Sequence, residues 1–134
     1  MRGMRKFLAP LLAGLLLLIA ACNAMPHKKV DMVGDFGNAV RWSDWDLAWQ
    51  YIDPATRHSL VLPGDEQDRL RDIKVTGYVV RTSEPQEDGT LMQLVEIHYV
   101  DQATQRERAV RSRQIWRTDD NGEHWWLTTG LPEF

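Results

Sequence analysis

The sequence is poor in cysteine and in metal-binding motifs. Its 134 residues hold one cysteine, Cys22, so no disulfide can form within the chain. The four histidines are widely spaced, and none belongs to an HxxxH or a Cys/His pair. We therefore expect no metal site and no cofactor. Since no diagnostic catalytic motif is present either, we assign no catalytic residue.

Long apolar runs are also lacking. The longest, Phe7 to Ala21, has fifteen residues, fewer than the ~20 that a membrane-spanning helix needs. It follows a basic start that contains Arg2, Arg5 and Lys6. This order predicts a signal peptide over residues 1–21 rather than a permanent transmembrane helix.

Residues Ile19-Ala20-Ala21-Cys22 resemble the lipobox of bacterial lipoproteins, in which an apolar branched residue and two small residues precede the modified cysteine. The resemblance implies cleavage before Cys22 and attachment of lipid, including palmitate, at its thiol. The protein would then be held on a membrane of the bacterial cell envelope. Asn23, in place of Asp, implies the outer membrane facing the periplasm if the host is Gram-negative. An ordinary secretory signal cut within residues 20–24 is the alternative.

Removal of the signal leaves 113 residues, enough for one domain. Three of the sixteen basic residues leave with it, so thirteen remain against nineteen acidic residues and the net charge becomes −6. An acidic chain of this kind is a poor partner for nucleic acid.

Residues 22–37 lack a sustained period and contain Pro26, Gly34 and Gly37. They predict a lipidated tether that leads into the domain. Four apolar residues in this stretch have the character to pack onto the domain: Val30, Met32, Val33 and Phe36.

The domain, residues 38–134, is expected to open with a helix. Ser43 is a candidate N-cap, with Asp46 three residues further on. Trp45, Ala48, Trp49 and Ile52 then follow the spacing of one helical face. Asp53-Pro54 interrupts that helix, and short helices are expected from Pro54 to Leu60 and from Asp65 to Arg71.

From Ile73 the period changes to alternation, which predicts four strands joined by turn-like segments: Ile73–Thr82, Thr90–Val100, Arg106–Thr118 and Glu123–Thr128. Short connections favour an antiparallel meander. Leu91, Val95, Ile97 and Tyr99 share the predicted buried face of the second strand. With the tryptophan-bearing helix as its cover, the sheet gives an α+β domain.

This element order, together with the segment Ala48 to Arg57 and the terminal Trp125-Trp126-Leu127, resembles the nuclear transport factor 2-like superfamily, and related cystatin-like folds fit similarly. The resemblance implies N-terminal helices packed on a curved antiparallel sheet that forms a cone over residues 38–134. The superfamily includes isomerases, dehydratases and binding modules. No position here matches a diagnostic motif of its enzymes, so no catalytic residue is carried over.

Two sets of side chains are candidates for a ligand or partner surface. The tryptophans Trp45, Trp49, Trp125 and Trp126 could fill the core or line an apolar pocket, with Trp125 and Trp126 on opposite faces of a strand. The arginines Arg111, Arg113 and Arg117 share one strand face, opposite Val110 and Trp116, while Arg106 and Arg108 point to the other face. They form either a solvated face or a surface for an acidic partner or phosphate.

The carboxylates Asp44, Asp46 and Asp53 would act as a general base only if burial raised a pKa, and capping explains them more simply. The leading hypothesis is a noncatalytic envelope lipoprotein whose domain binds a protein partner or envelope component. A pocket for a small molecule or lipid, and a small isomerase or lyase, are the alternatives.

Overall fold

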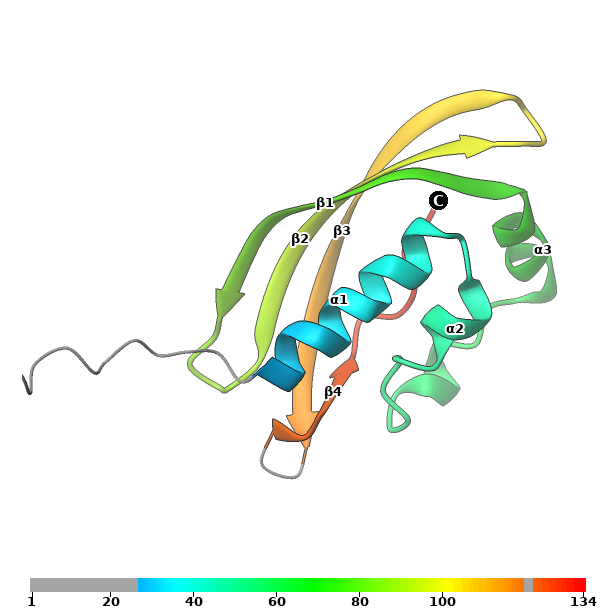
Figure 1. Ribbon diagram of the computed structural model, residues 1–134. Coiled ribbons are helices and arrows are strands. Elements are labelled where there is room, and N and C mark those ends of the chain that lie inside the picture. The colour runs from blue at the N-terminus through cyan, green and yellow to red at the C-terminus, as the bar shows by residue number, and fades with distance from the viewer. Residues whose placement is uncertain (1–26, 120–121) are drawn as a thin grey trace, which may run out of the picture.

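The computed structural model describes residues 27–119 and 122–134. The described residues form three α-helices, one 3-10 helix and a four-stranded antiparallel sheet, arranged as in Figure 1, which confirms the α+β class. The elements, in chain order, are α1 (His27–Arg41), α2 (Trp45–Trp49), the 3-10 helix η1 (Arg57–Ser59), α3 (Gly64–Asp72), β1 (Ile73–Pro85), β2 (Leu91–Asp101), β3 (Arg106–Asp119) and β4 (His124–Leu127).

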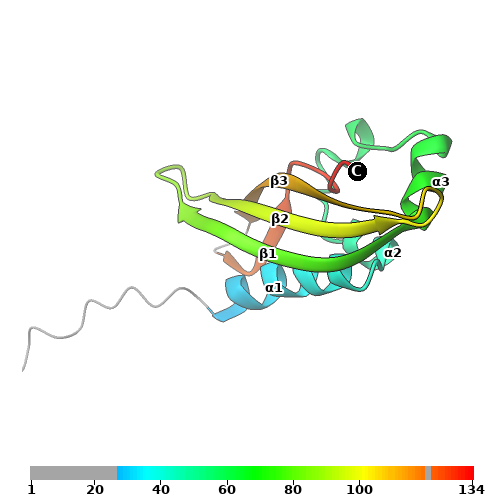
Figure 2. The same ribbon diagram turned by 90° about the horizontal axis from the view of Figure 1, so that it is seen from above.

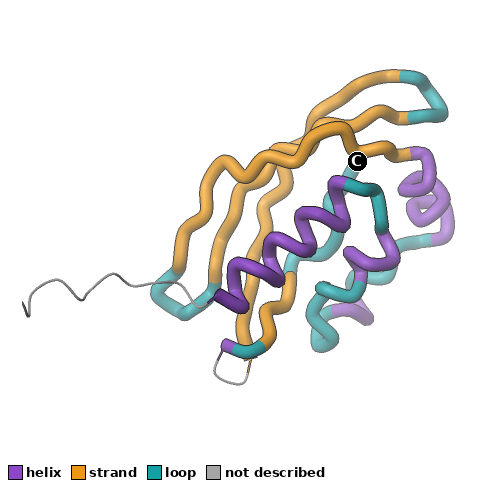
Figure 3. The backbone as a smooth tube through the Cα atoms, viewed as in Figure 1, coloured by secondary structure: helices purple, strands orange, loops and turns teal. Residues whose placement is uncertain are grey.

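The sheet is an antiparallel meander of order β1-β2-β3-β4, as predicted. The pairing of β2 with β3 is unbroken from Leu91 opposite Trp116 to Asp101 opposite Arg106. β1 carries two register shifts, between Val75 and Gly77 and between Val80 and Thr82. Because bulges bend a strand, these shifts contribute to the strong curvature of the sheet in Figures 1 and 3.

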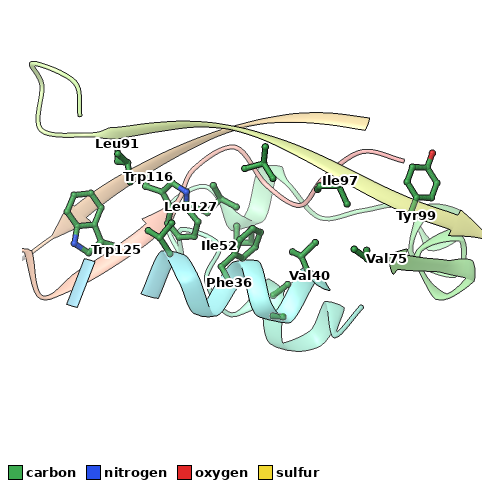
Figure 4. Packing of buried hydrophobic residues seen from close by; sticks show 14 of the residues in the cluster. Phe36, Val40, Ile52, Val75, Leu91, Ile97, Tyr99, Trp116, Trp125 and Leu127 are labelled. Atoms are coloured by element: carbon green, nitrogen blue, oxygen red, sulfur yellow. The ribbon is translucent and has the colours of Figure 1, made fainter. Parts of the chain in front are cut away.

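The core lies between the concave face of the sheet and α1 (Figure 4). Phe36 of α1 is fully buried and packs edge-to-face on Trp116 of β3, with ring centroids 5.3 Å apart. Val95 and Ile97 of β2 are also fully buried, and Tyr99 nearly so. The buried face predicted for this strand is therefore confirmed.

The expectation that residues 22–37 form a tether is wrong from His27 onward, because this part of the chain belongs to α1. Val33, Phe36 and Val40 follow one helical face and are buried. Packing of that face outweighs the low helix propensity of the two glycines. The domain therefore begins before residue 38, whereas the signal peptide and Cys22 lie outside the described residues.

The structure also corrects the first predicted helix. α2 has only five residues, and α1 rather than α2 is the main cover of the sheet (Figures 1 and 2). Asp44, not Ser43, is the N-cap, since its Oδ1 accepts a hydrogen bond from the Leu47 amide at 3.0 Å. Ser43 has a positive φ of 58°, and its Oγ accepts from the Val75 amide at 2.9 Å. The serine thus ties the α1–α2 turn to β1.

The later elements agree more closely with the sequence. The short helix expected after Pro54 is reduced to the 3-10 turn η1, and α3 begins at Gly64, one residue before its predicted start. Among the described helices, none is long and apolar enough to cross a membrane.

Candidate functional site

The outer face of the sheet carries a basic cluster, here called the basic face and defined by Arg81, Glu96, His98, Arg111 and Arg113. Glu96 of β2 accepts a hydrogen bond from Arg81 Nη2 of β1 at 3.0 Å, and it pairs with His98 Nε2 at 2.9 Å. Arg111 Nε of β3 lies 3.8 Å from its other oxygen. Hydrogen bonds from Arg81 and then His98 lower the pKa of Glu96. The carboxylate is therefore ionised at neutral pH.

The basic face keeps a surplus of positive charge. Arg111 and Arg113 are both exposed, and the unbroken β2–β3 register puts them on one side of the sheet. Among the described residues, Glu96 forms ion pairs with Arg81 and Arg111, whereas Arg113 lies opposite Leu94. Figure 2 looks down on this side, and the strands lie in front of the helices. Two guanidinium groups therefore flank the Glu96 carboxylate, and a third, that of Arg113, lies exposed on the same side of the sheet.

Arg117, predicted to join this surface, has a structural partner instead. Its Nη2 donates to Asp53 Oδ1 at 2.6 Å, and its Nε donates to Asp53 Oδ2. Asp53 is 1% exposed and also accepts from the Ala55 amide at 2.9 Å. The hydrogen bond from Arg117 lowers the pKa of Asp53, against the opposing effect of burial. The condition for Asp53 to act as a general base, a raised pKa, is therefore not met.

Trp125 and Trp126 point to opposite sides of β4, as expected. Trp125 is buried in the core, whereas Trp126 is half-buried beside Arg117. The Trp126 indole donates to Asp119 Oδ2 at 2.8 Å, and its ring stacks on His124 with centroids 5.8 Å apart. Neither side chain joins the other tryptophans in a common site.

Trp45 and Trp49 do share a pocket, of about 520 Å³, but it lies among α2, α3 and the C-terminal segment. Trp45 donates from Nε1 to the Leu70 carbonyl at 2.9 Å and packs edge-on against Phe134. The lining contains six apolar or aromatic side chains and five polar ones: Trp45, Trp49, Val61, Leu62, Leu70 and Leu131, and Ser43, Asp44, Asp46, Gln67 and Arg71. A small ligand with an apolar body and a polar end would suit this lining.

A second hollow, about 410 Å³ in volume, lies between α1 and β1 and is here called the α1–β1 groove. Its lining contains three apolar side chains, two glycines and five polar side chains: Val33, Val80, Leu91, Gly34, Gly37, Asn38, Arg41, Tyr78, Ser83 and Gln93. This groove was not predicted from the sequence, because Gly34 and Gly37 fall in the stretch that was expected to be a tether. The spacing of Gly34, Gly37 and Arg41 on one helical face was the available signal.

The polar groups of the groove are only partly satisfied. Gln93 is 6% exposed; its Nε2 donates to Ser83 Oγ at 3.1 Å, while its Oε1 has no hydrogen-bond partner. Tyr78 and Gln114 exchange hydrogen bonds of 3.2 and 3.1 Å, and burial raises the pKa of Tyr78 to about 12. Tyr78 therefore stays neutral and does not serve as a base near neutral pH.

No cluster of three or more histidine, cysteine or acidic side chains that could hold a metal is found in residues 27–119 and 122–134. No protein-family model matches the chain, and comparison with curated proteins and with solved structures finds no similar protein. The functional argument therefore depends on the chemistry of the surfaces described above.

Proposed function

We propose that this chain is a lipid-anchored protein of the bacterial cell envelope whose domain binds an acidic protein partner without catalysis. The observation that carries the proposal is the basic face, where Arg81 and Arg111 flank the Glu96 carboxylate and exposed Arg113 lies on the same side of the sheet. The lipobox-like residues Ile19 to Cys22 support the anchor, and Asn23 supports the outer membrane as its destination.

The composition of this surface suits a protein partner. Half-buried Met92 and Ile115 lie opposite each other beside the arginines, and half-buried Leu94 lies opposite Arg113. Arginine and methionine are enriched in protein interfaces. The apolar side chains among the arginines would pack against the partner and exclude water from the contact. The guanidinium groups present paired donors that match carboxylates.

The described ionisable groups give little support to an isomerase or lyase. Such an enzyme needs a buried acid or base whose pKa is shifted toward neutrality. The pKa of buried Asp53 moves in the opposite direction, and that of Tyr78 moves further above neutrality. Noncatalytic binding is the simpler role.

We also propose kinship with nuclear transport factor 2-like or cystatin-like folds. Support comes from α1, which lies on the concave side of a bent antiparallel meander (Figure 1). A cone of this kind is the arrangement that the resemblance implies. Since unrelated functions share such folds, the kinship adds nothing to the choice of partner.

A charge reversal tests the proposed function. We expect Arg111→Glu/Arg113→Glu to abolish cross-linking of the protein to its partner in intact cells, measured by mass spectrometry after gentle isolation from membranes. The matched control is Arg106→Glu/Arg108→Glu, which makes the same charge change on the same strand but on the opposite face. If both variants lose cross-linking equally, or if neither loses it, the basic face does not bind the partner.

The pocket formed by Trp45 and Trp49 favours a second candidate function, the binding of a small molecule or lipid. Its volume of about 520 Å³ is within the range of ligand sites. Native mass spectrometry of the gently isolated protein would then show a retained small molecule. Trp49→Ala should release it, whereas a bare protein mass from the wild type would count against this function.

A further inference from the structure

The α1–β1 groove lies beside a free sheet edge. β1 is the terminal strand, and no strand of the described chain pairs with its outer edge. Near its start this edge is occupied by Ser43, which accepts from the Val75 amide. The later half of β1, from Val79 to Pro85, is exposed throughout. Such an edge can accept another extended chain through main-chain hydrogen bonds.

We propose that the α1–β1 groove binds an extended polypeptide segment that adds to the edge of β1, inserts apolar side chains into the groove and places a carboxylate at Arg41. The proposal goes beyond the function proposed above, because the groove opens on the concave side of the sheet while the basic face is on the other side. It does not require the same partner at both places.

The apolar part of the groove is open beside this edge. Val80 of β1 is 45% exposed, and it shares the groove with Val33 of α1 and Leu91 of β2. Gly34 leaves the α1 side open, since a Cβ built there would meet no described atom within 4 Å. Successive side chains of an added strand point to opposite sides, so alternate ones would enter this space.

Two polar groups indicate what the segment must offer. Gln93 Oε1 is buried without a donor, which costs free energy until a ligand supplies one. Arg41 is exposed at the end of α1 and forms no ion pair with any described residue. An N–H or hydroxyl for Gln93 and a carboxylate for Arg41 complete the site.

An extended peptide meets these requirements together. Its backbone satisfies the β1 edge, its alternate side chains fill the apolar space, and an acidic side chain or C-terminal carboxylate pairs with Arg41. A fatty acid would satisfy the apolar space and Arg41 but would leave the strand edge unpaired. A second copy of this chain would bring a second Arg41 to the interface without a described counter-charge.

The test uses the full lipidated chain in nanodiscs and a library of random dodecapeptides displayed on phage. We expect enrichment of sequences that alternate apolar residues and carry a carboxylate. In fluorescence titrations with an enriched peptide, Gly34→Leu should weaken binding by at least about tenfold. The leucine would occupy the part of the groove that one apolar side chain of the peptide would otherwise fill, and losing one such contact costs about this much affinity. Gly64→Leu is the matched control, because Gly64 is also helical with open space around it, but it lies on α3.

Further variants separate a blocked groove from a damaged fold. Arg41→Gln should weaken the carboxylate peptide about tenfold and leave its amide analogue unchanged. Amide exchange within residues 79–85 should slow when peptide binds. Arg111→Glu/Arg113→Glu should bind the peptide like the wild type, so failure here is distinguishable from failure of the basic face.

Several results would overturn the proposal. These are the absence of enriched peptides, binding that Gly34→Leu leaves unchanged, and unchanged exchange along β1 in the complex. Retention of a small carboxylic acid that Gly34→Leu releases would assign the groove to a small molecule instead. Self-association lost on Gly34→Leu would assign it to a second copy.

Discussion

Gly34 and Gly37 lie three residues apart on α1, close to one turn, but their surroundings differ. A Cβ at Gly37 would lie 2.9 Å from Tyr78 Cε1, closer than real side chains approach, whereas a Cβ at Gly34 would meet nothing within 4 Å. The Tyr78 ring is held by its hydrogen bonds with Gln114 and cannot easily yield. Close packing against Tyr78 therefore requires glycine at position 37. At position 34 there is room for a side chain, so glycine there matters only for keeping the groove open.

Alanine substitutions separate these two roles. We expect Gly34→Ala to raise the free energy of unfolding by about 0.5–1 kcal/mol, because alanine is the better helix former. Gly37→Ala should lower it by about 1 kcal/mol, since overpacking exceeds the same propensity gain. Urea denaturation measures both. Equal effects of the two substitutions would contradict the packing of Tyr78 on α1.

Arg117 was predicted to lie on the binding surface, but it supports the fold through its ion pair with buried Asp53. Arg117→Ala would leave the Asp53 carboxylate buried without its main partner, and we expect the free energy of unfolding to fall by about 3 kcal/mol. The control is Arg113→Ala on the exposed outer face of the same strand, with a change within about 0.5 kcal/mol. Similar small changes in both variants would argue against the buried pair.

The same pair makes stability depend on pH. The folded-state pKa of Asp53 is lowered, so its stabilisation is complete above the unfolded value of about 4 and is lost as the pH falls through the folded value. Asp53→Asn should therefore reduce the loss of stability below about pH 4, measured by denaturation across pH. Part of the loss remains, because the pKa of Glu96 is lowered too. An unchanged pH profile in Asp53→Asn would contradict this assignment.

At the scale of elements, α1 is the clearest difference between the sequence prediction and the structure. Its two glycines and its basic start obscure a face that Phe36 and Val40 share, and only contact with Trp116 makes that face part of the core. Strand alternation is a local signal, so the meander and its buried face were predictable. The capping role of Asp44 was not, because the use of Ser43 depends on Val75, a residue far along the chain.

The role of α1 in the core is open to a direct test. Phe36→Ala should lower the free energy of unfolding by about 3–5 kcal/mol, the usual effect of removing a buried aromatic ring. Trp42→Ala is the control, because Trp42 follows α1 directly and is 80% exposed; we expect a change within about 0.5 kcal/mol. A small effect of Phe36→Ala, measured by the same denaturation, would support the original tether prediction instead.

The sequence predicted the parts of the candidate sites that depend on neighbouring residues, but not those that depend on contacts between distant ones. The alternation of β3 correctly placed Arg111 and Arg113 on one face, because no register shift interrupts its pairing with β2. It could not show that Asp53 binds Arg117, since the two are 64 residues apart in sequence. The α1–β1 groove needs both a helix and a distant strand, so no local pattern predicts it.

At the scale of the whole molecule, the proposed anchor at Cys22 would orient the domain. Cys22 precedes His27 by five residues, so the Cα atom at the start of α1 would lie within about 18 Å of the Cα atom of Cys22. The opposite end of the domain, with α3 and the β2–β3 turn, would then face away from the membrane (Figure 1).

The anchor has its own test in cells. We expect Cys22→Ser to abolish labelling by a palmitate analogue and to release the protein from the membrane fraction. Asn23→Asp is the control: it should keep the lipid and, in a Gram-negative host, move the protein toward the inner membrane. A labelled, membrane-bound Cys22→Ser protein would contradict lipidation at this residue.

The basic face can be tested most directly by photo-cross-linking in living cells from two adjacent positions of β3. Ala109 is exposed on the same face as Arg111, and its neighbour Arg108 is exposed on the other face. With a photoreactive amino acid at each position in turn, we expect a partner adduct from position 109 that disappears with Arg111→Glu/Arg113→Glu and is absent from position 108. Adducts of equal yield from both positions, or an adduct at 109 that survives the charge reversal, would contradict binding through the basic face.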